Sequence, residues 1–223
     1  MTEKTNNAEQ RQSPLVGGGG ALALLVVLAI LFVDQLTKIL VKTNMHLEER
    51  IPLIADKVYI YFVENPGFAF GMKFGGATGK IILTLFRLAA STLIAIYIRS
   101  IIKKAAPLGV VIGLSVILAG ALGNIIDSMF YGMLFSESTY STIAQFLPEG
   151  GGYAAFLQGH VVDMIHCPLF TIPQWIPFLG GGTFFSPIFN VADSAITVGV
   201  AYLLLFQRKF FKTEEKQVDK EMS

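Results

Sequence analysis

Two long stretches of this chain carry no charged side chain, and they limit its fold more than any other feature. Residues 15–33 and 105–126 are uncharged and mainly apolar. Each is close to the ~20 residues that a helix needs to cross a bilayer. The chain of 223 residues is 53% hydrophobic and only 15% charged, which is too apolar for a soluble domain of this size. We therefore expect a membrane protein built on transmembrane helices.

Two further apolar segments complete a set of four predicted helices. The first uncharged run is followed by Asp34 with no small-x-small cleavage site, and it is longer than the ~7–15 apolar residues of a signal peptide. We therefore expect it to be retained as a helix that continues amphipathically through Lys42. The other helices are expected at 81–98, where Arg87 interrupts the apolar sequence, at 105–126 and at 188–206.

The segments between the helices differ from them in composition. Residues 44–78 contain a β-rich run and an Asn-Pro-Gly turn, so we expect a small sheet there. Residues 128–187 form a long connection with several prolines and two Gly-Gly-Gly runs. The predicted fold class is an all-α membrane protein with four transmembrane helices, a small extracytoplasmic β-sheet and a long extracytoplasmic loop.

Positive charge is distributed unevenly along the chain. No Lys or Arg occurs from 105 to 207, whereas Arg99, Lys103 and Lys104 cluster between the second and third predicted helices, and the C-terminal tail is also rich in Lys. Connections rich in Lys and Arg face the cytoplasm. We therefore expect both termini in the cytoplasm. This prediction divides the chain into a cytoplasmic tail at 1–14, one membrane domain at 15–207 with 44–78 and 128–187 outside, and a second cytoplasmic tail at 208–223.

Four aspartates fall near one depth of this predicted membrane domain. Asp193 lies in an apolar helix, where burying a charged carboxylate near the bilayer centre costs about 2.5–3.5 kcal/mol on insertion scales. It should therefore face a protein interior or a cavity and have a partner. Asp34 and Asp127 lie at the outer ends of the first and third helices, and Asp163 lies in an apolar part of the outer connection. The predicted orientation gathers all four near the outer face.

Such a cluster is suited to hydrolysis of an amide bond. Two carboxylates that lie close together cannot both ionise cheaply and tend to share one proton. The ionised member takes a proton from water, and the protonated member polarises the scissile carbonyl before a proton passes to the leaving amine. One cysteine and three histidines without HExxH spacing give no pattern typical of a metal site. We predict no metal, no cofactor and, at a net charge of +1, no nucleic-acid partner.

Other roles for these residues stay open on the sequence alone. Asp34 can simply pair with Lys38 one turn later, and Asp127 and Asp193 can act as acids at helix ends. The carboxylates could also form the proton relay of a transporter, although four spans without a repeat or an inner carboxylate argue against it. An inactive membrane scaffold is a third hypothesis. We expect Arg87 to snorkel or to pair internally.

Five short motifs follow one another in an order that is specific for a known family. They are DQLTK at 34–38, NPGFAFG at 65–71, GNIID at 123–127, VVD at 161–163 and FNVADS at 189–194. Over residues 20–206 the chain resembles the lipoprotein signal peptidases, the signal peptidase II family. The resemblance implies an intramembrane aspartyl peptidase of the bacterial inner membrane. Such an enzyme removes the signal peptide from a prolipoprotein just before a cysteine that carries diacylglycerol.

The resemblance also implies roles for individual residues. The catalytic pair falls on Asp163 and Asp193. The implied partners are the lipid-modified precursor, membrane lipids and the cyclic peptide inhibitor globomycin, which in the family lies across the two aspartates. The segment 65–71 would belong to the sheet that cradles the substrate. Residues that bind substrate or support the pair fall on Asp34, Lys38, Asn65, Gly67, Asn124, Asp127 and Asn190.

The chain departs from the family pattern in three places. Ser128 stands where an arginine usually follows the aspartate of the third motif, so a cation near the site is missing. An insertion around 133–159 lengthens the stretch before Asp163, and we expect an extracytoplasmic elaboration that could act as a lid. The Pro- and Gly-rich segment 167–187 lengthens the stretch before Asp193. Neither insertion interrupts a motif.

Overall fold

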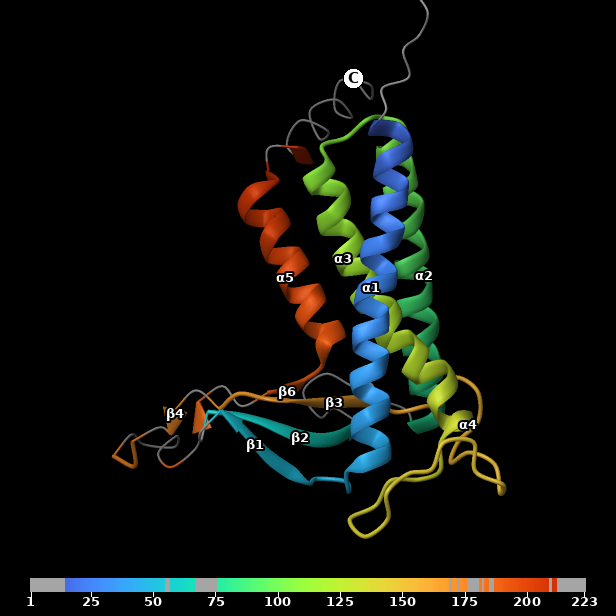
Figure 1. Ribbon diagram of the computed structural model, residues 1–223, viewed down its shortest axis with the longest axis vertical. Coiled ribbons are helices and arrows are strands. Elements are labelled where there is room, and N and C mark those ends of the chain that lie inside the picture. Colours follow the sequence, from blue (N-terminus) through green and yellow to red (C-terminus); the bar gives the residue numbers. More distant parts are fainter. Residues whose placement is uncertain are drawn as a thin grey trace, which may run out of the picture.

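The structure is a computed structural model of the chain. The tail expected at 1–14, nearly all of the tail expected after 207, and the part of the second motif from Gly67 to Gly71 lie outside the residues that the structure describes, whereas Asn65 and Pro66 of that motif are described. In the described part, a bundle of helices stands on a sheet that lies across one end (Figure 1). The described residues are 15–54, 57–66, 76–168, 170–171, 173–175, 181, 183–184, 187–208 and 210–211.

The described chain contains four long helices: α1 (Leu15–Asn44), α2 (Gly76–Lys103), α3 (Leu108–Ile126) and α5 (Val191–Phe206). Three helical segments, at 18–44, 78–103 and 108–134, are long and apolar enough to cross a membrane, whereas α5 is apolar but has only 16 residues. Large apolar side chains cover the outside of the bundle, as a lipid-facing surface requires, and α2 is longer at both ends than predicted.

Helical structure continues past the predicted end of the third helix. α3 stops at Ile126, but a π-helical turn, η2 (Asp127–Tyr131), and a short helix, α4 (Gly132–Leu134), follow without a break. The non-helical connection therefore begins after Leu134, not at 128 as expected. Asp127 was expected at the outer end of the third helix, but the structure buries its carboxylate against Lys38, and the helical structure continues past it.

The small antiparallel sheet predicted from the sequence is present, and it is assembled from two distant parts of the chain. β1 (Arg50–Ile54) and β2 (Val58–Asn65) pair antiparallel within the segment where a small sheet was expected. β3 (Val161–His166) pairs with β2, and β6 (Ile188–Phe189) pairs with β3, in the order β1-β2-β3-β6. β3 was predicted only as an apolar part of the connection, and residues 188–189 were assigned to the last helix, which begins instead at Val191. A separate pair, β4 (Phe170–Thr171) and β5 (Thr183–Phe184), extends from the end of the sheet.

The inserted segment after α4 packs against the sheet. Phe135 and Ala144 are buried in one apolar cluster with Phe62 of β2 and with Val162 and Met164 of β3. Strand side chains alternate between two faces, so Phe62, Val162 and Met164 point to the face that the insertion covers. Asp163, between Val162 and Met164 on β3, points to the opposite face together with its pairing partner Val63 of β2.

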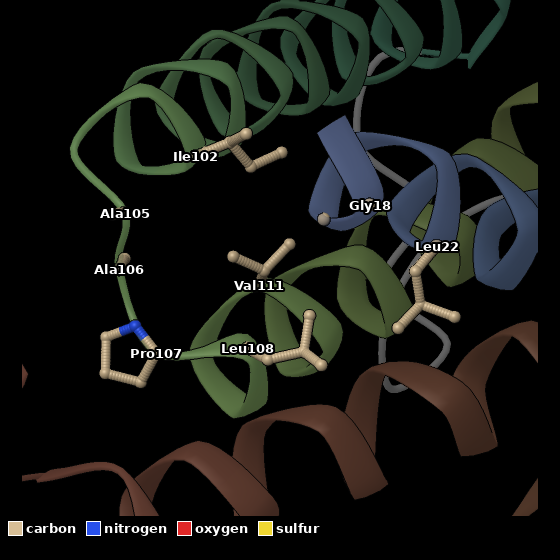
Figure 2. Close-up of a pocket in the computed structure, with 9 residues that line it drawn as sticks. Gly18, Leu22, Ile102, Ala105, Ala106, Pro107, Leu108 and Val111 are labelled. Carbon is tan, nitrogen blue, oxygen red and sulfur yellow. The ribbon is translucent and has the colours of Figure 1, made fainter. Parts of the chain in front are cut away.

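An apolar pocket of about 400 Å³ lies at the other end of the bundle (Figure 2). It is enclosed by the start of α1, the α2–α3 connection and the start of α3. No charged side chain is among its lining residues, so it offers no acid–base chemistry. These residues are Gly18, Gly19, Leu22, Ile102, Ala105, Ala106, Pro107, Leu108 and Val111.

Candidate active site

The four aspartates singled out in the sequence all lie toward the end of the bundle that meets the sheet. Asp34 is on α1, Asp127 on η2, Asp163 on β3 and Asp193 on α5. Asp34, Asp127 and Asp163 are buried, and Asp193 is half-buried. Hydrogen bonds divide the four into two groups, one around Lys38 and one formed by Asp163 and Asp193, and Asn124 belongs to both.

The start of α5 fixes the position of Asp193. Asn190 is the N-cap residue, and its side-chain oxygen accepts a hydrogen bond from the Asp193 backbone amide at 2.8 Å. In return, the Asp193 carboxylate accepts one from the Asn190 backbone amide at 3.3 Å, which completes a capping box. The second carboxylate oxygen accepts a hydrogen bond from Asn124 Nδ2 at 2.7 Å. Asp193 is therefore an acid of the first helical turn and also a member of the polar site.

The side chain of Asn190 joins the two aspartates. Its oxygen holds the helical turn of Asp193, while its Nδ2 donates to Asp163 Oδ1 at 2.7 Å. The same nitrogen lies 3.0 Å from Asn124 Oδ1 and 3.3 Å from the carbonyl oxygen of Val162. Asn190 is fully buried, and its amide connects Asp163 to the helical turn that carries Asp193.

Asp163 occupies an environment that favours its protonated form. Burial and the nearby charge of Asp193 raise the pKa of Asp163 from 3.8 to about 7, against the opposing effects of Asn65, Lys38 and Asn190. Asn65 Nδ2 donates to its second oxygen, Oδ2, at 3.1 Å. A carboxyl group with such a pKa can hold or release a proton near neutral pH, which acid–base catalysis requires.

Lys38 is the centre of the second group. Its ammonium lies 2.9 Å from Asp34 Oδ2, 2.8 Å from Asp127 Oδ2 and 2.9 Å from Asn124 Oδ1, and the lysine and both acids are fully buried. The pairing of Asp34 with Lys38, which the sequence left open, is thus present, and Asp127 shares the same cation. Both Asp34 and Asp127 are therefore ion-paired with Lys38.

The Lys38 group also holds the backbone next to each member of the aspartate pair. Asp34 Oδ1 accepts a hydrogen bond from the backbone amide of Ala192 at 2.8 Å, and Asp127 Oδ2 accepts one from Val162 at 3.2 Å. Each amide belongs to the residue immediately before Asp193 or Asp163. The ion pair therefore orients both aspartates through the chain that carries them.

Sequence reasoning missed two residues of this network. Gln35 Nε2 lies 2.9 Å from Asp127 Oδ1 and 3.1 Å from Asp34 Oδ2. Tyr131 is buried and donates its hydroxyl hydrogen to Gln35 Oε1 at 3.1 Å. The place of Gln35 directly after Asp34 in the first motif was the only available signal for it. Tyr131 lies in η2, which the sequence assigned to the outer connection.

The position of Ser128 also becomes clear. Its hydroxyl is buried and donates to the backbone carbonyl of Asn124 at 2.9 Å, so it closes a helical turn and contributes no charge. A cation from another helix acts on the pair instead. The half-buried Arg87 of α2 interacts electrostatically with both Asp193 and Asp163.

Two glycines of α3 allow the elements that carry the acids to approach each other. A Cβ on Gly123 would lie 2.6 Å from Asp34 Oδ2 and 3.0 Å from the Ala192 Cβ, and one on Gly120 would overlap the Ala192 carbonyl oxygen. The distance to Asp34 is shorter than real Cβ contacts, and the distance to Ala192 is tighter than most of them. Glycine at these two positions therefore lets α1 and α5 pack closely against α3.

The residues present give little support for a bound metal. Among the residues that the structure describes, no group of three or more His, Cys, Asp or Glu side chains could hold one. The position between Asp34 and Asp127 is taken by the Lys38 ammonium. The chemistry that these groups can perform is transfer of protons by two carboxyl groups.

The fold and the site together define a class of protein, a helical membrane enzyme with two linked aspartates where the bundle meets a sheet. Two solved structures of a bacterial membrane enzyme, both determined by the in meso method, are similar to the chain. The structure at 2.3 Å resolution has a TM-score of 0.55 at 27% identity. The match covers 85% of this chain and 88% of the chain in that structure. The structure at 1.9 Å resolution has the same TM-score at 28% identity, with 83% and 91% covered.

Sequence comparisons identify the family within this class. A family model described as signal peptidase (SPase) II matches residues 26–209. The lipoprotein signal peptidase of Porphyromonas gingivalis is 45% identical over 192 residues, which cover 84% of this chain and 82% of the relative. That of Amoebophilus asiaticus is 33% identical over 189 residues, which cover 82% and 76%. The chain belongs to the signal peptidase II family and is a peptidase, which confirms the prediction made from the five motifs.

Proposed function

We propose that this peptidase removes the signal peptide from diacylglyceryl-modified prolipoproteins, cutting just before the lipidated cysteine, and that Asp163 and Asp193 are its catalytic residues. The observation that carries the proposal is the buried Asn190 side chain, which holds both residues at once. The names of the relatives support the substrate class. The raised pKa of Asp163 supports a pair that shares one proton.

The reaction needs only the two carboxyl groups and a water molecule. The ionised aspartate takes a proton from water, and the water oxygen forms a bond to the scissile carbonyl carbon. The protonated aspartate donates a hydrogen bond to the carbonyl oxygen, which stabilises the developing negative charge. As the carbon–nitrogen bond breaks, a proton passes to the leaving amine, and the pair again holds one proton.

Supporting residues divide into those that touch the pair and those that orient it. Asn65, Asn124 and Asn190 donate hydrogen bonds directly to the carboxylates. Lys38, with Asp34 and Asp127, acts through the backbone of the neighbouring residues. Gly67, two residues after Asn65, is proposed as a substrate contact from the family resemblance alone. We also propose that a globomycin-type inhibitor lies across the two aspartates.

We propose four membrane crossings in the bacterial inner membrane, with both termini in the cytoplasm and the site near the outer face. The cations Arg99, Lys103 and Lys104 lie around the α2–α3 connection, at the end of the bundle away from the sheet, which supports this orientation. At about 1.5 Å per residue, the 16 residues of α5 extend about 24 Å, short of the ~30 Å hydrocarbon core. With its C-terminal end at the cytoplasmic surface, a helix of this length would leave Asp193 just below the outer surface, which supports the proposed depth of the site.

The proton-relay hypothesis finds no support on the helices. Over the described residues, α1 before Asp34, α2, α3 and α5 after Asp193 carry no Asp or Glu. A relay across the membrane needs titratable groups through its depth. Hydrolysis at one face does not.

Cleavage of a diacylglyceryl-modified precursor by the purified chain tests the proposal. Asp163→Asn and Asp193→Asn should each lower kcat by at least about a hundredfold, because each removes one partner of the acid–base pair. Glu149→Gln, at an exposed site on the inserted segment, is the matched control and should cleave normally. Full cleavage by both aspartate variants, in folded protein, would refute the proposal.

The pH profile of the same reaction gives a second test. A pair that must hold one proton gives a bell-shaped dependence of kcat/KM on pH. The basic limb should fall near the Asp163 pKa of about 7. A rate that stays constant from strongly acidic to strongly basic pH, with chemistry rate-limiting, would contradict the mechanism.

A further inference from the structure

A second polar group, here called the Lys42 cluster, consists of Lys42, Glu64 and Ser138, which are largely or fully buried, and the half-exposed His160. The Lys42 ammonium, one turn after Lys38 on α1, is ion-paired with Glu64 of β2 and donates to Ser138 Oγ at 2.9 Å. The Ser138 hydroxyl donates to Glu64 Oε1 at 2.7 Å. The other carboxylate oxygen of Glu64 lies 3.0 Å from His160 Nδ1. None of these residues belongs to the roles assigned so far.

Aromatic rings from the inserted segment close this cluster. Lys42 Nζ lies 5.0 Å from the centre of the Tyr153 ring and 5.5 Å from that of Phe135, within the range of cation–π attraction. The Tyr153 hydroxyl oxygen accepts a hydrogen bond from the His160 backbone amide at 2.6 Å. Burial alone would raise the pKa of Glu64, but the bond to His160 and the charge and hydrogen bond of Lys42 lower it to about 2. Glu64 is therefore held as an anion.

The inserted segment is thereby attached to the sheet and to α1 at several separate points. Its buried Phe135 and Ala144 join the apolar cluster on β2 and β3. Its far end is fixed to α2, where Lys80 Nζ donates to the backbone carbonyl of Gln158 at 2.7 Å. A segment that supplies core side chains and buried hydrogen bonds acts as a support for the sheet, which argues against the lid role that the sequence left open.

The Lys42 cluster and the aspartate pair meet at two consecutive residues of β2. Side chains alternate along a strand, so Glu64 faces the cluster while Asn65 faces Asp163, to which it donates a hydrogen bond at 3.1 Å. In the antiparallel register, Glu64 lies opposite Val162 and Asn65 opposite Val161. His160, which contacts Glu64, comes directly before Val161 in the chain. A displacement of Glu64 would therefore move Asn65 relative to Asp163.

We propose that Glu64 is a positioning residue of the peptidase, fixed by Lys42, Ser138 and His160 so that the Asn65 amide is held against Asp163. The inference rests on the proposed catalytic role of Asp163. Glu64 acts through Asn65 and does not touch the reacting atoms. The inserted segment has a role in this arrangement because it provides Ser138 and the ring of Tyr153.

The charged groups around Glu64 and Asp163 determine how a substitution at Glu64 can change the pKa of Asp163. Glu64 is faced by Lys42 of α1 and His160 next to β3, and it interacts electrostatically with Tyr153 of the insertion and Lys80 of α2. The groups that act on Asp163 are Asp193, Lys38 and Arg87. Removing Glu64 therefore changes the setting of Asp163 mainly through Asn65.

The test is the kinetics of Glu64→Gln, purified as the full chain, with the diacylglyceryl-modified precursor as substrate. We expect kcat to fall about tenfold with KM within about twofold, as for a lost hydrogen bond to a charged group. The basic limb of kcat/KM should move to higher pH by about half a unit or more, because the hydrogen bond from Asn65 favours ionised Asp163. Glu137→Gln, which removes an exposed acid near Lys42, is the control and should match the wild type.

Double substitution separates positioning from a general loss of stability. Asn65→Ala should produce the same shift of the basic limb, and Glu64→Gln/Asn65→Ala should produce no further shift. Shifts that add in full would overturn the proposal. If Glu64→Gln does not fold with Lys42 unpaired, Lys42→Gln/Glu64→Gln removes both charges, and a wild-type kcat and pH profile in that folded variant would equally overturn it.

Failure of this inference is distinguishable from failure of the proposed function. An inactive Asp163→Asn together with normal Glu64 variants would refute only the positioning role. An active Asp163→Asn would refute the proposed catalytic role of Asp163, on which the positioning role rests, whatever the Glu64 variants show.

Discussion

Two lysines one turn apart on α1 are fully buried, and the chain neutralises them in different ways. Lys38 lies between two carboxylates, Asp34 and Asp127, and beside an amide oxygen. Lys42 has one carboxylate, Glu64, together with a hydroxyl group and two aromatic rings. An isolated buried charge is very costly, so each lysine depends on these partners for its place in the fold.

The difference between the two surroundings separates what aligns the aspartates from what supports the sheet. The partners of Lys38 extend their hydrogen bonds to the backbone amides of Val162 and Ala192. The partners of Lys42 belong to β2 and to the inserted segment. One lysine thus connects three helical elements to the site, and the other connects an insertion to the strand that carries Asn65.

The largest expected effect is that of Lys38→Met. It leaves two buried carboxylates without a cation, and breaking a buried ion pair in this way costs about 3–5 kcal/mol. Lys42→Met should cost clearly less, because Glu64 keeps its hydrogen bonds from Ser138 and His160. Thermal unfolding of both variants in detergent measures the difference. Equal losses of stability would remove the distinction between the two lysines.

The contributions of Asp163, in the aspartate pair, and of Glu64, in the Lys42 cluster, to the free energy of unfolding should change with pH in opposite directions. The folded state raises the pKa of Asp163 from 3.8 to about 7, so it holds a proton that the unfolded chain releases. The contribution of Asp163 to the free energy of unfolding therefore falls as pH rises between these values. The folded state lowers the pKa of Glu64 from 4.5 to about 2, so its contribution is present above 4.5 and is lost as pH falls to about 2.

Unfolding temperatures across pH check this prediction. Asp163→Asn should flatten the dependence between about pH 4 and 7, and Glu64→Gln should flatten it only below about pH 4.5. Each variant is the control for the other. The same change of slope in both would show that the two carboxyl groups titrate as one unit.

The two regions also differ in how far the sequence could predict them. The motifs located Asp34, Lys38 and Asp127 because each belongs to a short pattern of neighbouring residues, DQLTK or GNIID. β3 was not recognised, because its apolar residues do not alternate with polar ones apart from Asp163. Lys42 was predicted only as the polar end of an amphipathic helix. Its partners lie far away in the sequence and in no motif, so only the fold brings them together.

A smaller effect is expected from Gly123→Ala. The new methyl group would meet Asp34 Oδ2 and Ala192 in the Lys38 region, and such overpacking typically costs about 1–3 kcal/mol. Gly150→Ala, in the inserted segment, places its methyl group where nothing lies within 4 Å and should leave stability unchanged. Unfolding temperature and kcat should both fall for Gly123→Ala. A normal kcat in a destabilised Gly123→Ala would show that the approach of α1 and α5 matters for stability alone.

The smallest expected effects come from removing one tyrosine hydroxyl group near Lys38 and one near Lys42. Tyr131→Phe removes the hydrogen bond to Gln35, whose amide nitrogen serves the carboxylates around Lys38, and Tyr153→Phe removes the acceptor of the His160 amide. Each should cost about 1 kcal/mol of stability. Because the bonds of Gln35 end on Asp127, which orients Asp163, Tyr131→Phe should lower kcat without changing KM. Tyr153→Phe acts one step further away, on the residue that binds Glu64, and should lower kcat less. The reverse order of kcat values would mean that Asp163 depends more on its strand neighbours than on the buried Lys38 group.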